Sequence, residues 1–190
     1  MVARHLTLPH RFVCFCDDPA AVPDGIETLP MAVPHWRWNL RKMALYRPDN
    51  GLTGRVLALD LDTVIVGNID DIANYGGRFA VVEDFWRPGK NGGGIIGFEA
   101  GTLAADLYDP VAENSLNVTI ATKGAERLWY DIRMPGADHW QDLYPGQVAS
   151  YKPSPGRFLT KLPRKTRIVC FHGKPAVHEV NTDWVLENWK

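Results

Sequence analysis

The stretch Arg55-Val-Leu-Ala-Leu-Asp-Leu-Asp-Thr-Val-Ile-Val66 decides the fold class. It begins as an apolar run, places two acids one residue apart, and continues as a second apolar run rich in β-branched residues. Short continuous apolar runs are typical of strands that are buried in a sheet. Because a buried strand does not normally carry two carboxylates, Asp60 and Asp62 are the first candidates for a functional site.

The rest of the chain predicts strands that alternate with helices. Further apolar runs predict strands at Phe12–Cys16, Phe79–Val82, Gly94–Phe98 and Arg167–Phe171. Apolar periodicity predicts helices around Trp36–Ala44, at Thr102–Leu107 and at Ala125–Arg133, whereas the three prolines of Val22–Pro34 favour a loop with at most an edge strand. This order predicts one α/β domain over residues 1–190, with a largely parallel sheet and ligands at the carboxyl ends of its strands.

Composition narrows the function classes. The chain has 190 residues, 45% of them hydrophobic and 23% charged, and a formal net charge of -1. It therefore lacks the overall basic charge that holds nucleic acid or anionic lipid. No apolar stretch approaches the roughly 18 residues of a membrane span, and Met1-Val-Ala-Arg lacks an apolar signal core. We expect a cytoplasmic protein with no membrane span.

The three cysteines suit that compartment, because an odd and small number is a poor disulfide framework. Cys14 and Cys16 stand on alternate positions of an apolar run, and Cys170 stands in another. A zinc site built from the three is conceivable. Buried thiols in strands explain the pattern more simply.

The spacing of Asp60 and Asp62 favours a metal ion. In an extended chain residues i and i+2 point to the same side, so the two carboxylates would converge. A hard divalent cation relieves the repulsion between the two carboxylates. Other oxygen ligands and a bound phosphate can complete the coordination shell of that cation. The alternative is a solvated turn whose acid caps a helix.

A second polar group follows a predicted strand at His172-Gly-Lys174. Imidazole is a ligand for ions such as Mn²⁺, and a lysine ammonium is a compact charge suited to phosphate. Gly173 lets the backbone approach a ligand closely. Taken alone, His172 is more simply an ordinary hydrogen-bonded residue, and only its pairing with the two acids favours a ligand role.

The segment Gly54-Arg-Val-Leu-Ala-Leu-Asp-Leu-Asp-Thr-Val-Ile-Val-Gly-Asn-Ile-Asp-Asp-Ile72 resembles the DxD segment of GT-A-fold glycosyltransferases, in particular family 8-like sequences of bacteria and phages. The resemblance extends upstream through Leu8–Asp18. Downstream it covers Trp140–Lys152 and the late Ile168-Val-Cys-Phe-His-Gly-Lys-Pro175, and then Pro175–Glu179. It covers nearly the whole chain, and it implies a GT-A fold and transfer of a sugar from a nucleotide-sugar donor to an unknown acceptor.

The resemblance assigns a role to each residue of the two motifs. It implies that Asp60 and Asp62 hold Mn²⁺ or Mg²⁺ against the donor diphosphate, with His172 as a further metal ligand. It implies that Lys174 contacts the diphosphate, beside Gly173. The chemistry is glycosyl transfer, in which fixed positive charge neutralises the leaving nucleoside diphosphate.

Other positions match the family less closely. Lys42, with Arg41, corresponds to a basic helix residue that reaches toward the donor. Asn91 is the nearest match to an expected sugar-contacting asparagine but is displaced by one residue, and Ala125-Glu126 stands where an Asp-Gln pair is expected. The family's first strand and helix have no counterpart before Val2. No residue can be named as the catalytic base.

Two other functions fit parts of the pattern. One is a degenerate member of the same fold that binds nucleotide and transfers nothing, as the departures suggest. The other is a phosphatase of the haloacid dehalogenase superfamily, in which an apolar strand also ends in Asp-x-Asp. In that superfamily a threonine stands two places after the second acid, whereas Thr63 directly follows Asp62.

Overall fold

The computed structural model describes residues 1–33 and 35–189, so Pro34 of the proline-rich segment lies outside the described residues. Contacts between Cα atoms divide the chain, which we expected to form one domain, into two compact units. Unit 1 consists of Met1–Leu8, Leu57–Phe98 and Ala137–Lys190, and unit 2 of Pro9–Val56 and Glu99–Gly136. In the described part of the chain, every helix is too short or too polar to cross a bilayer.

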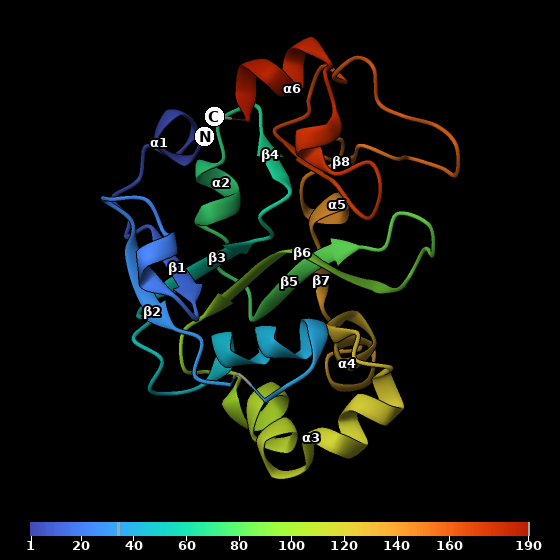
Figure 1. The fold of residues 1–190 in the computed structure, drawn as a ribbon. Coiled ribbons are helices and arrows are strands. Elements are labelled where there is room, and N and C mark those ends of the chain that lie inside the picture. The colour runs from blue at the N-terminus through green and yellow to red at the C-terminus, as the bar shows by residue number, and fades with distance from the viewer. Residues whose placement is uncertain (34, 190) are drawn as a thin grey trace. The chain divides into compact units, whose positions relative to one another are not determined.

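Unit 1 contains two small sheets and the helices that flank them (Figure 1). The strands of the first sheet lie in the order β3-β6-β5-β7, and those of the second in the order β4-β9-β8. The strands are β3 (Arg55–Leu59), β4 (Thr63–Ile65), β5 (Phe79–Glu83), β6 (Asn91–Glu99), β7 (Asp138–His139), β8 (Val148–Ser150) and β9 (Ile168–Cys170). The helices are α1 (Val2–His5), α2 (Asp70–Ala73), α5 (Trp140–Leu143), η4 (Val177–Glu179) and α6 (Asp183–Asn188). The chain passes between the units four times: after Leu8, within β3, at the end of β6 and after Gly136.

Strand β9 is buried on both of its faces, as its continuous apolar sequence predicts. Ile168 and Cys170 belong to one hydrophobic cluster, which includes Trp140. Val169 and Phe171 belong to another, which includes Trp184. Because successive strand residues face opposite sides, the short sheet β4-β9-β8 separates the two clusters and is held between them.

Gly97 of β6 leaves room for the largest buried side chain of unit 1. A Cβ atom added at Gly97 would stand 2.7 Å from Cζ2 of Trp140. Trp140 is completely buried and donates its indole N–H to the carbonyl of Ile95 at 3.0 Å. The glycine in the Gly94–Phe98 run is therefore required by close packing against an indole ring.

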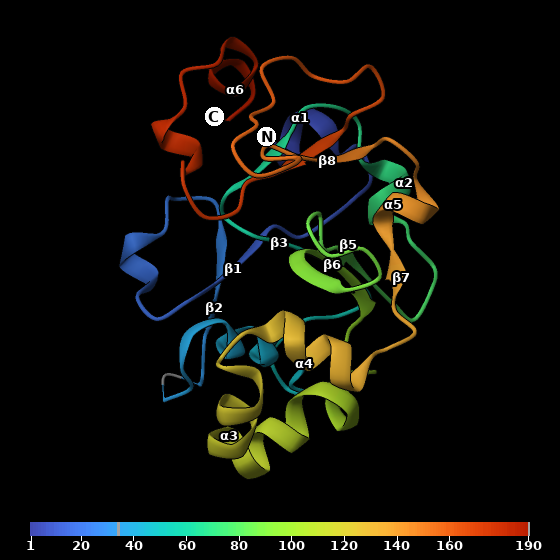
Figure 2. The same ribbon diagram turned by 90° about the vertical axis from the view of Figure 1, so that its right-hand side faces the viewer.

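Unit 2 joins a two-stranded parallel sheet to a helical layer, and in Figure 2 the helices α3 and α4 lie side by side. Its elements are β1 (Val13–Cys16), η1 (Pro19–Ala21), β2 (Glu27–Pro30), η2 (Trp38–Tyr46), η3 (Ala104–Tyr108), α3 (Asp109–Thr122) and α4 (Glu126–Arg133). The residues predicted to form the apolar face of a helix are all buried: Trp36, Leu40, Met43 and Ala44. Most of this segment is a 3₁₀ helix, which begins after Trp36.

The prediction of a mostly parallel sheet is wrong, because the strands pair in both directions. Strands β8 and β9 are parallel, as are β5 and β7, but β4 runs antiparallel to β9 and β5 antiparallel to β6. For β5 and β6 the cause is the length of the connection. Parallel neighbours need a crossover of about a dozen residues or more, whereas only residues 84–90 join β5 to β6.

Candidate functional site

Three chain segments with polar side chains meet at one edge of the sheet β4-β9-β8. Ser150 of β8 pairs with Cys170 of the parallel strand β9, so Lys152 and His172 leave their strands at the same level. Thr63 of β4 pairs with the same Cys170, and the Phe171 N–H donates to the Asp62 carbonyl at 3.2 Å. The predicted acids and the predicted histidine, far apart in sequence, therefore share one sheet edge.

Asp60 and Asp62 lie in a turn rather than on the extended strand that our argument assumed. The N–H of Thr63 donates to the carbonyl of Asp60 at 3.0 Å, which closes the turn. Both acids are half-buried, whereas Leu61 between them is 91% exposed. The N–H of Asp60 also donates to the carbonyl of Gly94 in β6 at 2.9 Å. Main-chain hydrogen bonds thus fix the turn between the two sheets of unit 1.

The ring of His172 is held by a serine and two aromatic side chains. Its Nε2 lies 2.8 Å from Oγ of Ser150. The ring of Phe85 stacks on it, with centroids 6.0 Å apart and planes 11° apart, and Trp86 meets it edge-on at 5.1 Å. Burial, and after it the neighbouring Lys152 ammonium, lower the pKa of His172 below its ordinary value, which favours the neutral imidazole that metal binding requires.

Lys174 and Gly173 lie in the exposed turn that follows His172. The ammonium of Lys174 lies 2.6 Å from Oε1 of Glu179, and 78% of its side chain is exposed. Gly173 has a φ of +61°, in the left-handed region that favours glycine. Lys174 is thus at the expected edge, but in this arrangement its charge pairs with a carboxylate of the chain.

Lys152 is a member of the site that our sequence argument did not single out. It is buried, and its ammonium donates to the carbonyl of Lys174 at 2.8 Å. Burial lowers the pKa of Lys152, and the carboxylate of Asp62 opposes that shift. The signal was available, because Lys152 follows the apolar Val148-Ala149 just as Asp60 follows β3 and His172 follows β9.

Two further predicted substrate-binding residues are paired with other side chains of the chain. Lys42 lies in unit 2, where its ammonium forms an ion pair with the buried Glu126 at 3.0 Å. Asn91 is buried in unit 1, and its carboxamide oxygen lies 3.0 Å from Nε2 of His139. The reach of Lys42 toward a donor and the contact of Asn91 with its sugar stay predictions.

The donor set suits a divalent cation only together with a ligand. Among the described residues, no three histidine, cysteine or acidic side chains gather closely enough to hold a metal ion. A preformed centre of Asp60, Asp62 and His172 is therefore not built in this arrangement. Mg²⁺-type ions, however, are commonly held by one or two carboxylates together with substrate phosphates and water. Two half-buried acids at a strand end fit that mode of binding.

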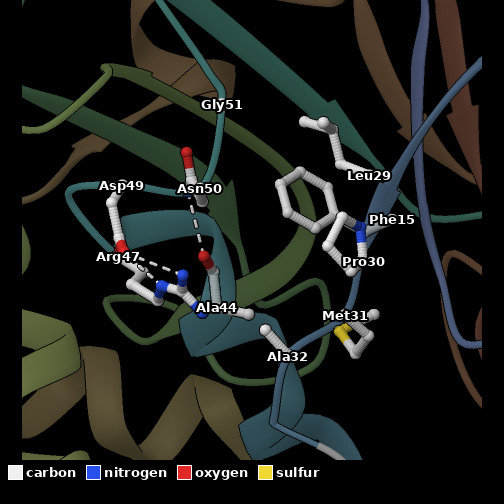
Figure 3. Close-up of a pocket in the computed structure, with 10 residues that line it drawn as sticks. All are labelled: Phe15, Leu29, Pro30, Met31, Ala32, Ala44, Arg47, Asp49, Asn50 and Gly51. Atoms are coloured by element: carbon white, nitrogen blue, oxygen red, sulfur yellow. Dashed lines mark hydrogen bonds and ion pairs between the residues drawn. The ribbon is translucent and has the colours of Figure 1, made fainter.

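A pocket in unit 2 does not coincide with the candidate site (Figure 3). Its volume is about 170 Å³, below the roughly 300 Å³ at which ligand pockets of ordinary size begin. Apolar side chains such as Phe15, Leu29 and Met31 form one wall. The polar groups on the other wall are engaged with each other, since Arg47 pairs with Asp49 and Asn50 donates to the carbonyl of Ala44. We assign no ligand to this pocket.

Neither family models nor curated proteins gave a match to this chain. The site itself therefore offers the features that bear on function: an acidic turn, a histidine in an aromatic setting, and two lysines at one sheet edge.

Proposed function

We propose that the chain is a GT-A-type glycosyltransferase that transfers a sugar from a nucleotide-sugar donor with the help of Mn²⁺ or Mg²⁺. The observation that carries the proposal is the convergence of the Asp60–Thr63 turn with the His172–Lys174 turn at one sheet edge. Acids beside lysines are what binding of a metal diphosphate requires, because the cation needs carboxylates and the phosphates need positive charge.

Each residue would have a separate task in this chemistry. Asp60 and Asp62 would hold the cation, which when bound supplies positive charge to the departing diphosphate. Lys174 would exchange its exposed contact with Glu179 for a phosphate oxygen, at little cost because exposed ion pairs are weak. His172, kept neutral by its surroundings, would complete the polar wall of the site. The acceptor and the base are not assigned.

The test is a thermal-shift screen of nucleoside diphosphates and their sugar conjugates, each with Mn²⁺ and with EDTA. Ligands that bind the folded state alone raise its stability. We expect a nucleoside diphosphate with Mn²⁺ to give the largest shift, and the corresponding nucleotide sugar to be hydrolysed slowly without an acceptor. No shift from any diphosphate would contradict the proposal.

The same measurements separate the two other functions. Binding without donor hydrolysis or transfer would indicate the degenerate nucleotide-binding member of the fold. Release of phosphate from a generic phosphate ester, with no preference for nucleotides, would indicate the phosphatase.

A further inference from the structure

Lys152 is fixed in place by all of its polar groups. Its main-chain N–H donates to Oγ of Ser150 at 2.8 Å, and its carbonyl accepts from the indole N–H of Trp86 at 2.9 Å. Its ammonium donates to the carbonyl of Lys174 at 2.8 Å. A lysine ammonium carries three N–H donors, and this contact uses one of them. The charge is therefore held at a defined point with donors that can serve further oxygen acceptors.

The surroundings of this ammonium combine opposite charge with an open side. Asp62 interacts with it electrostatically across the sheet edge. A Cβ atom added at Gly173 would lie 3.5 Å from Nζ of Lys152. Gly173 is itself exposed and has no side chain, so no Cβ atom fills the space beside the ammonium on that side.

We propose that Lys152 is a second phosphate-binding lysine, which contacts the diphosphate from beneath Gly173 while Lys174 contacts it from the exposed side. This inference rests on the proposed function, and it names the ligand chemistry of Lys152 as a pyrophosphoryl group. A diphosphate carries several negative oxygens within a few ångströms and matches two ammonium groups that flank one glycine. The ammonium then complements a cation on Asp60 and Asp62 and does not replace it.

The experiment is calorimetric titration with inorganic pyrophosphate, UDP and GDP in the presence of EDTA, so that lysine charge is measured without a metal ion. The variants are Lys152→Met, Lys152→Arg and the exposed control Lys161→Met. We expect Lys152→Met to weaken binding at least about tenfold, which is the scale of one hydrogen bond to a charged group. Lys152→Arg should retain part of the affinity, and Lys161→Met should bind as wild type.

A purely structural role of Lys152 is separated by a second variant. Gly173→Ala keeps every charge but adds a methyl group over the ammonium, so it should also weaken pyrophosphate binding. Thermal unfolding of each variant shows whether it is folded. If Lys152→Met does not fold, Lys152→Arg decides the question, because a role of Lys152 confined to folding predicts wild-type affinity in that variant.

The outcomes distinguish this inference from the proposed function. If nucleoside diphosphates bound wild type tightly and bound folded Lys152→Met and Gly173→Ala with the same affinity, the role of Lys152 would be overturned. The proposed function would not be affected by that result. Lysine-dependent binding of pyrophosphate without binding of any nucleoside diphosphate of the thermal-shift screen, in EDTA or with Mn²⁺, would support the anion site and contradict the glycosyltransferase proposal. No binding of pyrophosphate or of any nucleoside diphosphate to wild type, in EDTA and with Mn²⁺, would overturn both.

Discussion

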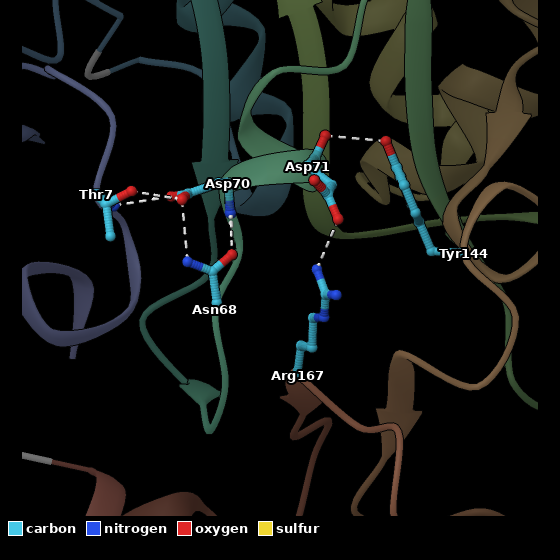
Figure 4. A network of polar contacts seen from close by, with 6 residues as sticks. All are labelled: Thr7, Asn68, Asp70, Asp71, Tyr144 and Arg167. Atoms are coloured by element: carbon cyan, nitrogen blue, oxygen red, sulfur yellow. Dashed lines mark hydrogen bonds and ion pairs between the residues drawn. The ribbon is translucent and has the colours of Figure 1, made fainter.

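Two pairs of acids in one segment of unit 1 look alike in sequence and differ in the structure. Asp70 accepts hydrogen bonds from the N–H of Thr7 at 2.7 Å and from the amide of Asn68 at 3.0 Å, and Asp71 pairs with Arg167 at 3.0 Å (Figure 4). These carboxylates tie helix α2 to the amino-terminal segment and to the start of β9. The main chain of Asp60 fixes its turn to β6, and the main chain of Asp62 fixes it to Phe171, which follows β9.

At Asp70 and Asp71 the carboxylates themselves join segments that are far apart in the sequence. At the Asp60–Thr63 turn main-chain hydrogen bonds also hold the segment, so we expect the turn to survive a change of either carboxylate. The two pairs should therefore respond in opposite ways to the same substitution of aspartate by asparagine.

The largest effect is expected for Asp60 and Asp62. Asp62→Asn and Asp60→Asn should each weaken Mn²⁺-dependent binding of a nucleoside diphosphate by about tenfold to a hundredfold, since even outer partners of metal sites have effects of that size. The midpoint of thermal unfolding should change little. Calorimetric titration and a thermal melt of the same samples measure both quantities. Unfolding of both variants, or unchanged binding in both, would contradict the account.

Asp70→Asn should do the reverse and lower stability without changing diphosphate binding. Hydrogen bonds from Asn68 and then Thr7 hold the pKa of Asp70 at about 2, below its ordinary value of 3.8. Ionised Asp70 therefore contributes stability that is present above the ordinary pKa and is lost as the pH falls toward 2. Urea unfolding measured from pH 2 to 6 should show a flatter pH dependence in the variant. An identical pH dependence in both proteins would show that the Asp70 contacts do not matter.

A smaller effect is expected at the competing carboxylate of Glu179. This side chain pairs with Lys174 and also accepts the Ala176 N–H at 2.6 Å. Glu179→Gln should free the lysine and strengthen binding of a diphosphate by about twofold to fivefold, which is the range of an exposed ion pair. The gain should vanish in Lys174→Met. A gain that persists without Lys174 would assign the effect to another group.

The smallest effect is expected for the ion pair of Asp71 and Arg167. Both side chains reach solvent, with 62% and 29% exposed, so the pair should contribute no more than about 1 kcal/mol. Arg167→Met should lower the free energy of unfolding within that limit, less at high salt than at low salt, and leave ligand binding unchanged. Urea unfolding at two salt concentrations measures it. A loss of several kcal/mol would mean that the ion pair of Asp71 and Arg167 is more than a surface contact.

The strands of the site could be predicted from sequence, because each is a short apolar run that ends in polar residues. This holds for β3 and β9, whose ends carry Asp60 and His172. The same rule applied to Val148-Ala149 would have found Lys152. The pairing of β8 with β9 could not be predicted, since residues 151–167 separate the two strands and their register is set by packing of both faces.

Other features required the tertiary structure. The ring of Phe85, which lies between the antiparallel strands β5 and β6, stacks on His172. Helix α3 was not predicted, although its Pro110 is compatible with a helix, since proline is tolerated in the first turn. The capture of Lys42 by Glu126 depends on contact between η2 and α4, which the spacing of 84 residues does not reveal.

The most direct measurement is the retention of Mn²⁺, followed by electron paramagnetic resonance, with and without a nucleoside diphosphate that binds. In the proposed function, Asp60 and Asp62 form a cation site that a bound diphosphate completes. Wild type and Asp70→Asn should therefore bind Mn²⁺ weakly alone and at least about tenfold more tightly with the diphosphate, whereas Asp62→Asn should lose most of that gain. If the diphosphate increased Mn²⁺ affinity as much in Asp62→Asn as in wild type, the proposal would be contradicted. It would also be contradicted if Asp70→Asn lost this increase to the same extent as Asp62→Asn.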